Sequence, residues 1–125
     1  MAARPKPLRG EIWSFDLNPK KGREQKGVRP CLVVSTDALN RSDFGTVVVC
    51  PITTTERPRF KWRVGVVPED LRLTDQGWHA RPHWLETDQL VTVDTRHRAL
   101  RHLATLVDED KLAAVDDSIR MMLNL

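Results

Sequence analysis

The chain has 125 residues, a length that favours a single domain, and 40% of them are hydrophobic while 30% are charged. This composition is ordinary for a globular domain, and no apolar run approaches the ~20 residues of a membrane-spanning helix. The first nine residues are basic and lack the apolar stretch of a secretory signal, so the expected compartment is the cytoplasm.

The net charge of +3 is distributed unevenly along the chain. Residues 1–30 hold eight Lys or Arg and three acidic residues, whereas residues 107–125 hold two and five. A basic front half suits a polyanionic partner, although a solvated surface of uneven charge gives the same pattern. Cys31 and Cys50 lie in apolar runs and are expected to be buried, reduced thiols, with a disulfide between adjacent strands as the alternative.

Residues 1–9 are predicted to be a loose basic arm, and residues 10–125 are predicted to form a single domain. Gly10–Leu17 is predicted to be a strand, because Trp13, Phe15 and Leu17 alternate onto one face. Asn18–Val28 is polar and contains Pro and Gly, which predicts a loop.

The middle of the chain predicts further short strands. Cys31–Ser35 and the valine-rich Thr46–Thr53 are predicted to be buried strands, with a short helix or turn over Thr36–Asp43 between them. The remaining predictions are a loop over Thr54–Arg59, an alternating strand over Phe60–Val67, a loop with one helical turn near Glu69–Leu71 inside Pro68–Pro82, mostly strand over His83–Asp94, and a short strand over Leu103–Leu106.

The end of the chain predicts an amphipathic helix. Asp108 is a suitable N-cap, and Glu109 and Asp110 suit the positive N-terminal end of a helix. Apolar residues then recur at three- and four-residue spacing, at Leu112, Val115, Ile119 and Met122. Many short strands followed by one helix predict a mainly β fold with a small, strongly curved, barrel-like sheet.

The sharpest candidate for a binding site is the polar loop and the strand that follows it. The loop carries Lys20, Lys21, Arg23, Glu24, Gln25 and Lys26. It leads into Arg29-Pro30 at a strand start, which places several cations and amides beside a fixed guanidinium. Such a group can bind phosphates and distinguish bases, while a structural ion pair is the alternative for Arg29.

Several motifs together resemble the MazF/PemK family of toxin endoribonucleases, the mRNA interferases of type II toxin–antitoxin systems. In order, they are Gly10–Trp13, Asp16–Pro19, the Gly-x-Glu-Gln loop Gly22–Gln25, Arg29–Ser35, Pro51–Thr53 and the segment from Asp88-Gln89 to Thr92 and Asp94. The last twenty residues also resemble the family's final helix. Two features depart from the pattern: Arg23 stands where many members have serine, and Pro68–Pro82 is longer than a minimal member needs.

The resemblance implies an SH3-like β-barrel, a homodimer, an antitoxin partner, and metal-independent cleavage of single-stranded RNA with no cofactor. By position it assigns Arg29 and Thr53 to catalysis, and it places Gln89 with the loop residues among those that contact RNA. Arginine suits the charged transition state but not proton transfer, because its pKa above ~12 leaves almost no free base. Glu24 and Asp88 are therefore the candidates for the general base.

Other readings stay open on the sequence alone. A barrel of this kind also occurs in CcdB, which inhibits DNA gyrase without cutting nucleic acid, and an inactive member would bind RNA without cleaving it. His79, His83 and Glu86 make a weak metal-ligand pattern, because Pro82 interrupts any helical spacing. Trp13 and Trp62 are expected in the core, and Trp78 and Trp84 are candidates for stacking on bases.

Overall fold

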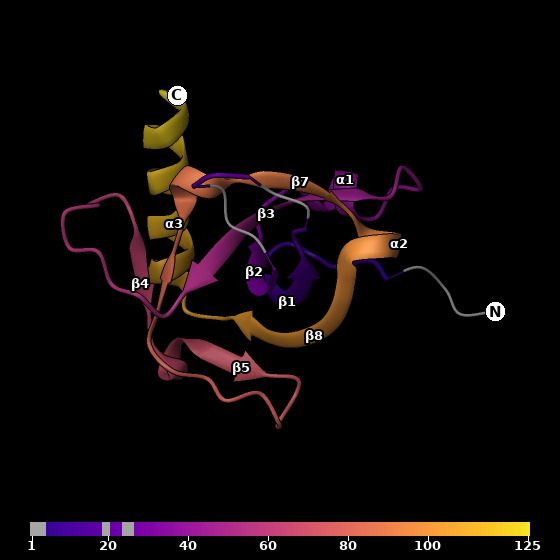
Figure 1. Cartoon of the computed structure of the whole chain (residues 1–125), viewed down its shortest axis with the longest axis horizontal. Helices are drawn as coiled ribbons and strands as arrows, with labels where there is room; N and C mark the ends of the chain where they lie inside the picture. The colour runs from indigo at the N-terminus through magenta and orange to yellow at the C-terminus, as the bar shows by residue number, and fades with distance from the viewer. Residues whose placement is uncertain (1–4, 19–20, 24–26) are drawn as a thin grey trace.

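The computed structural model describes residues 5–18, 21–23 and 27–125. Within them, a curved antiparallel sheet has the strand order β4-β6-β3-β2-β1-β8-β5, and β7 also pairs with β3 (Figure 1). The strands are β1 (Glu11–Asp16), β2 (Val28–Val33), β3 (Thr46–Thr53), β4 (Val64–Val66), β5 (Leu71–Leu73), β6 (His83–Leu85), β7 (Val91–Asp94) and β8 (Ala99–Leu106). The helices are α1 (Asp37–Asn40), α2 (Thr95–Arg98) and α3 (Glu109–Leu123), with 3-10 turns η1 (Pro68–Asp70) and η2 (Thr87–Gln89).

The central strands are buried on both faces because the sheet separates two apolar clusters. Along β2, Leu32 belongs to one cluster while Cys31 and Val33 belong to the other. Along β3, Cys50 and Ile52 join Leu32, and Val47 and Val49 join Cys31. This alternation explains the continuous apolar runs in the sequence. Both cysteines are fully buried free thiols, as predicted.

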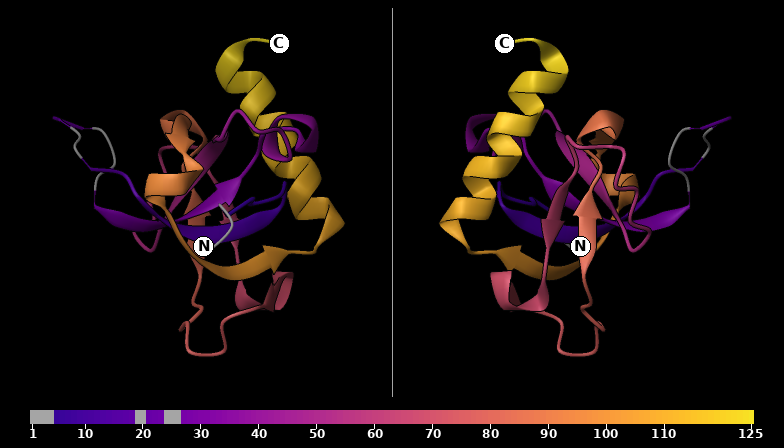
Figure 2. Two further views of the ribbon diagram at one scale, coloured as in Figure 1. Left: turned by 90° about the vertical axis from the view of Figure 1, so that its right-hand side faces the viewer. Right: turned by 90° about the vertical axis from the view of Figure 1, so that its left-hand side faces the viewer.

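Helix α3 covers the first of these clusters and leans across one side of the sheet (Figure 2). The Asp108 carboxylate caps it by accepting from the backbone N–H of Lys111 at 3.0 Å, which confirms the predicted start. Leu112, Val115 and Ile119 pack into the cluster. The Ser118 hydroxyl lies 2.7 Å from that of Thr87 in η2 and also donates to the carbonyl oxygen of Trp62. The helix is therefore tied to two segments that approach the candidate site.

Most of the predicted elements are confirmed. The strand predicted over Thr46–Thr53 has those bounds, β1 lies within Gly10–Leu17, and the short helix follows Thr36. The fold is mainly β with a C-terminal helix, as expected. Residues 7–9 of the predicted arm pack on the domain: Pro7 is buried, and the Arg9 guanidinium donates to the Val34 carbonyl and pairs with Asp116.

Some predicted boundaries were wrong, each for a local reason. The strand expected over Phe60–Val67 is only Val64–Val66, because backbone hydrogen bonds from Phe60 to Arg57 and from Arg63 to Phe60 close turns before it. The segment His83–Asp94 is broken by η2. β2 starts at Val28 instead of Cys31, since β1 continues to pair with it. β5 and α2 were not predicted, and β8 begins at Ala99.

No helix among the described residues has the length and apolar character needed to cross a membrane.

Candidate functional site

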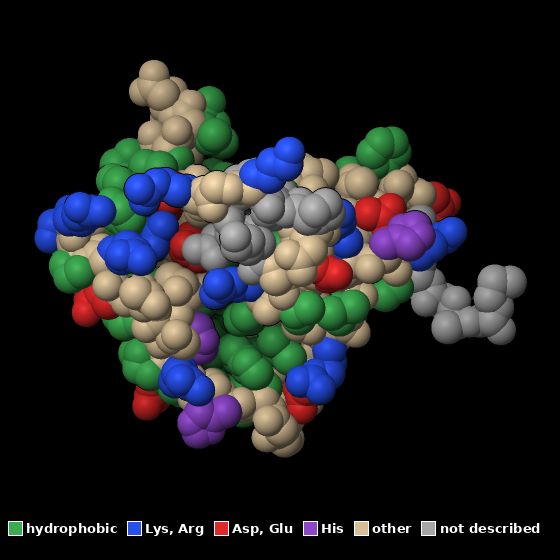
Figure 3. Space-filling model, in the orientation of Figure 1, with side chains coloured by type: hydrophobic (Ala, Val, Ile, Leu, Met, Phe, Trp, Pro, Cys, Tyr) green, Lys and Arg blue, Asp and Glu red, His purple; other side chains and the backbone are tan. Residues whose placement is uncertain are grey.

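A polar hollow of about 490 Å³ opens beside the ends of β2 and β3. We call it the arginine hollow; its cationic lining residues are Arg23, Arg29, Arg57, Arg59 and Arg63. Lys and Arg side chains gather on this face of the molecule over the connection between β3 and β4 (Figure 3). The hollow is also lined by Thr53, Thr55, Phe60, Glu86, Asp88 and Gln89. It therefore combines a dense positive charge with two carboxylates and several uncharged polar groups.

Arg29 of β2 and Thr53 of β3 both line the arginine hollow. The pairing of β2 with β3 ends at Cys31 opposite Pro51, and Arg29 and Thr53 each lie two residues beyond this last pair. Arg29 is paired with Phe15 of β1, which fixes its backbone on that side. Thr53 is only 8% exposed, and its hydroxyl oxygen accepts from the backbone N–H of Thr55 at 3.1 Å. Both functional groups thus stand on rigid strands at the wall of the arginine hollow.

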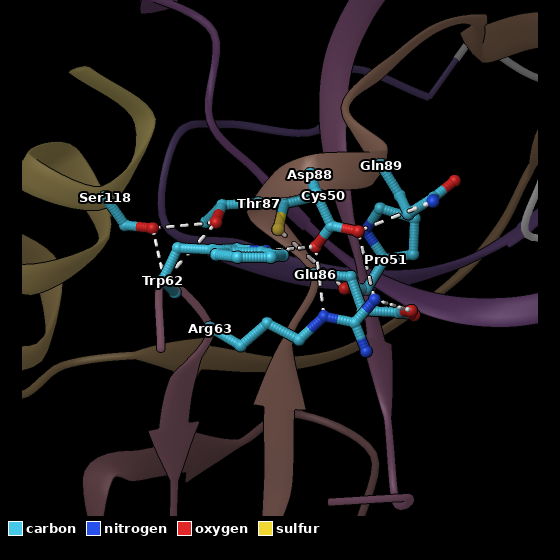
Figure 4. Close-up of polar contacts among 9 residues, drawn as sticks. All are labelled: Cys50, Pro51, Trp62, Arg63, Glu86, Thr87, Asp88, Gln89 and Ser118. Carbon is cyan, nitrogen blue, oxygen red and sulfur yellow. Dashed lines mark hydrogen bonds and ion pairs between the residues drawn. The ribbon is translucent and has the colours of Figure 1, made fainter. Parts of the chain in front are cut away.

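The floor of the hollow is a charge cluster around Arg63 (Figure 4). The guanidinium donates to both carboxylate oxygens of Asp88 at 3.0 Å, and it lies 3.2 Å from the Glu86 carboxylate. The side chain of Arg63 is 7% exposed and that of Glu86 is 1% exposed. The Trp62 indole N–H adds a 2.8 Å hydrogen bond to Asp88. This cluster connects the loop before β4 to the segment between β6 and β7.

The charge cluster keeps Asp88 ionised. Burial by itself would raise the pKa of Asp88, but the hydrogen bonds from Arg63 and Trp62 outweigh it and lower the pKa to about 2. A carboxylate with so low a pKa accepts a proton poorly at neutral pH. The geometry therefore suits Asp88 to holding Arg63 and Trp62 in place, and it weakens the case for Asp88 as the general base.

The aromatic residues of this region are part of the same arrangement. Phe60 and Trp62 stack with their ring centroids 5.0 Å apart, and the guanidinium carbons of Arg59 and Arg63 lie 5.0 and 4.9 Å from the Phe60 centroid. Trp62, predicted to fill the core, instead donates to Asp88 beside the hollow. Trp13 does pack against the core, and it stacks on His102 at 5.1 Å. The rings give the connection before β4 a defined shape.

The remaining predicted residues divide into three groups. Gln89 and Arg23 line the arginine hollow, and the Gln89 amide lies 3.5 Å from Asp88. Lys21 is exposed on the loop between β1 and β2. The other four, Lys20, Glu24, Gln25 and Lys26, lie outside the described residues.

Sequence reasoning missed the contribution of the segment before β4. Arg57, Arg59 and Arg63 alternate there with Phe60 and Trp62 in the run RPRFKWR. Cations interleaved with aromatic rings are typical of nucleic-acid-binding surfaces, so this pattern was the available signal. Glu86 was considered only with His79 and His83 as a weak metal set. The structure instead pairs Glu86 with Arg63 and places the two histidines outside the arginine hollow.

The fold is that of a small curved-sheet protein of the kind seen in solved structures of MazF toxins. The structure superposes on MazF from Deinococcus radiodurans with a TM-score of 0.71, at 23% identity over 97% of this chain and 99% of that one. An endoribonuclease from a mycobacterial species, solved in complex with its cognate antitoxin, gives a TM-score of 0.67 at 22% identity over 96% and 95% of the two chains. Both likenesses concern the fold.

The sequence establishes the family. Residues 8–123 match the profile of the PemK-like, MazF-like toxins of type II toxin–antitoxin systems, and the chain belongs to that family. It is also 31% identical over 121 residues to endoribonuclease MazF9 of Mycobacterium tuberculosis, which covers 94% of this chain and 96% of the relative.

Proposed function

We propose that this toxin is an endoribonuclease that cuts single-stranded RNA at preferred sequences, without a metal ion, in the cytoplasm. The observation that carries the proposal is that Arg29 of β2 and Thr53 of β3 line one hollow rich in arginine. The naming of the similar MazF9 as an endoribonuclease supports the same activity. Guanidinium groups provide the positive charge that the phosphate needs, and they do so without a bound cation.

The reaction we propose is attack of a ribose 2′-hydroxyl on the adjacent phosphate. The 2′-oxygen forms a bond to phosphorus as the bond to the 5′-oxygen breaks, which leaves a 2′,3′-cyclic phosphate and a free 5′-hydroxyl. Arg29 donates to the phosphate oxygens as their negative charge grows, and the Thr53 hydroxyl donates to the same group. The 2′-hydroxyl proton passes to a base, and the leaving oxygen takes up a proton. Glu24 remains the candidate base from the sequence, because the low pKa of Asp88 makes its carboxylate a weak proton acceptor.

The proposed partners follow from charge and exposed apolar surface. The loop between β1 and β2 and the arginine hollow attract a polyanion, and an antitoxin with an extended acidic segment would compete with RNA for them.

Exposed apolar residues at the end of α3 favour a homodimer: Met121, Leu123 and Leu125 are 57%, 55% and 87% exposed. Sedimentation at micromolar concentration should show a species twice the 14.3 kDa chain mass, and a monomer alone would contradict the dimer.

Two alternatives on the same fold are a toxin that binds a protein target without cleavage and an inactive RNA-binding member. The presence of Arg29 and Thr53 at one polar hollow favours cleavage, because a pure binder needs neither of them. Incubation of the purified chain with a long RNA in EDTA separates these cases. Cleavage in EDTA supports the proposal, whereas binding without cleavage supports the inactive member.

The decisive variants are Arg29→Ala and Thr53→Val. Loss of one donor to the transition-state charge typically lowers the rate by ~10²–10³, and we expect a loss of that size for Arg29→Ala. Circular dichroism should show an intact fold. Arg72→Ala is the matched control, because this exposed arginine of β5 is not among the residues that line the hollow. A folded Arg29→Ala protein that cleaves at the parent's rate would refute the assignment.

A further inference from the structure

A second, smaller hollow of about 270 Å³ shares Arg29 with the arginine hollow. We call it the histidine hollow; the residues that matter for the argument are Arg29, Thr54, Trp78, His79, Arg81 and His83. Four of these come from β6 and the connection before it, which extends away from the body of the molecule (Figure 2). Because Arg29 lines both hollows, an RNA strand whose phosphate binds Arg29 can reach either of them.

The wall of the histidine hollow is held in place from several directions. Trp78 and His83 stack with ring centroids 5.7 Å apart and an interplanar angle of 29°. The backbone N–H of Trp78 donates to the Asp75 carbonyl at 3.1 Å, and the Asp75 carboxylate pairs with Arg101 of β8 at 2.7 Å. Trp78 also packs against the core cluster under α3. A preformed aromatic wall of this kind orders little on binding, so it costs a ligand little entropy.

The His83 ring of this wall is uncharged. The imidazole is 7% exposed, and its Nδ1 contacts the carbonyl oxygen of Arg81, which can only accept a hydrogen bond. Burial lowers the pKa of His83, so the ring is neutral at pH 7 with Nδ1–H as donor and Nε2 as acceptor. The exposed side chains of His79, Arg81 and Thr54 stand around it. None of the residues that line the hollow, in the part of the chain that the structure describes, is acidic.

We propose that the histidine hollow binds the base of the nucleotide next to the cleaved bond, on the side away from the arginine hollow. This proposal rests on the proposed ribonuclease function and adds a specificity site to it. Aromatic rings, imidazoles and guanidinium planes are the groups on which unpaired bases stack. The Thr54 hydroxyl and the His83 Nε2 acceptor suit the hydrogen-bonding edge of a base, because a phosphate has no donor for the Nε2 acceptor. The volume of about 270 Å³ lies near the lower limit of about 300 Å³ for small-molecule sites, a size that suits a single base. The arginine hollow, which among the described residues is lined by five arginines where the histidine hollow has two, serves the RNA backbone.

The test compares cut-site maps of the parent and a His79→Ala/Arg81→Ala double variant. Both side chains are exposed, so the fold should be unaffected. On one long RNA, the double variant should cut the parent's preferred sites about tenfold more slowly and lose the base preference at one position beside the cleaved bond. Arg72→Ala, which removes one positive charge outside the hollow, should keep the parent's preferences. A double variant with the parent's rate and preferences would overturn the proposal.

A second readout does not depend on cleavage. The indole N–H resonance of Trp78, assigned by its absence in Trp78→Phe, should shift when a pool of randomised hexaribonucleotides is added. If the parent binds the pool but cuts no RNA, the ribonuclease proposal fails while a shift of Trp78 still supports a base site. An unshifted Trp78 resonance in a protein that binds the pool would overturn the base site whether or not RNA is cut.

Discussion

Replacing Arg63 with methionine removes the cation between Glu86 and Asp88 while keeping a side chain of similar length. Glu86 is 1% exposed, so its carboxylate loses that counter-charge in a region that water barely reaches. Removing one partner of a buried ion pair typically costs about 3–5 kcal/mol. We expect about 3 kcal/mol here, because the Asp88 end of the cluster is 22% exposed and solvent screens part of the effect. With ~2.1 cal/mol/K of unfolding entropy per residue, this corresponds to a fall in Tm of about 11 °C for 125 residues.

A double-mutant cycle separates the ion pair from other effects of the substitution. Urea unfolding of the parent, Arg63→Met, Glu86→Gln and the double variant at pH 7 gives the four free energies. Because the two side chains touch, their effects should be non-additive by about 1 kcal/mol or more, with Glu86→Gln partly rescuing Arg63→Met. Arg72→Met is the control for loss of a surface charge and should be near neutral. Additive effects, or an Arg63→Met midpoint equal to the parent's, would show that the cluster does not stabilise the fold.

Three further predictions concern acid stability, RNA specificity and the last helix. The lowered pKa of Asp88 means that its contribution to the free energy of unfolding is fully present above about pH 4 and is lost as pH falls toward 2. Asp88→Asn should therefore reduce the loss of stability between these pH values by about 1 kcal/mol, as measured by unfolding at a series of acid pH values. An unchanged pH dependence would count against the pairing. Charge reversal at Lys20 and Lys21 should weaken RNA binding at all sequences and flatten its salt dependence. Gln25→Ala should instead change which sites are cut. If both variants keep the parent's cut sites and salt response, the loop does not recognise RNA. Asp108→Ala should cost about 1 kcal/mol by urea unfolding through loss of the α3 N-cap, with the exposed Asp117→Ala as a near-neutral control.

The sequence was a good guide wherever one periodicity ran uninterrupted. The valine-rich β3 and the helix after Asp108 could be placed closely, because their apolar spacing decides which residues are buried. The break at η2 could not be placed, since it depends on Thr87 meeting Ser118, 31 positions further along the chain. The turn before β4 likewise depends on Arg63 reaching Asp88 and Glu86.

The site shows the same division between local and distant information. Arg29 and Thr53 were predicted from motifs at the ends of two predicted strands, and both line the arginine hollow. Glu86 and the arginines before β4 were missed, because their place in the hollow comes from pairings across the sheet. The low pKa of Asp88 is also a consequence of contacts that no single stretch of sequence contains.

The buried cysteines make the folded toxin resistant to thiol reagents. Cys31 and Cys50 are the two cysteines of the chain, both fully buried on central strands. Burial raises the pKa of each thiol, so neither carries the thiolate that alkylating agents and peroxides attack. Modification of either thiol then requires the apolar cluster around it to open, and the rate of modification under native conditions measures how often that opening occurs. The two native thiols therefore report the rate of local opening without an added label.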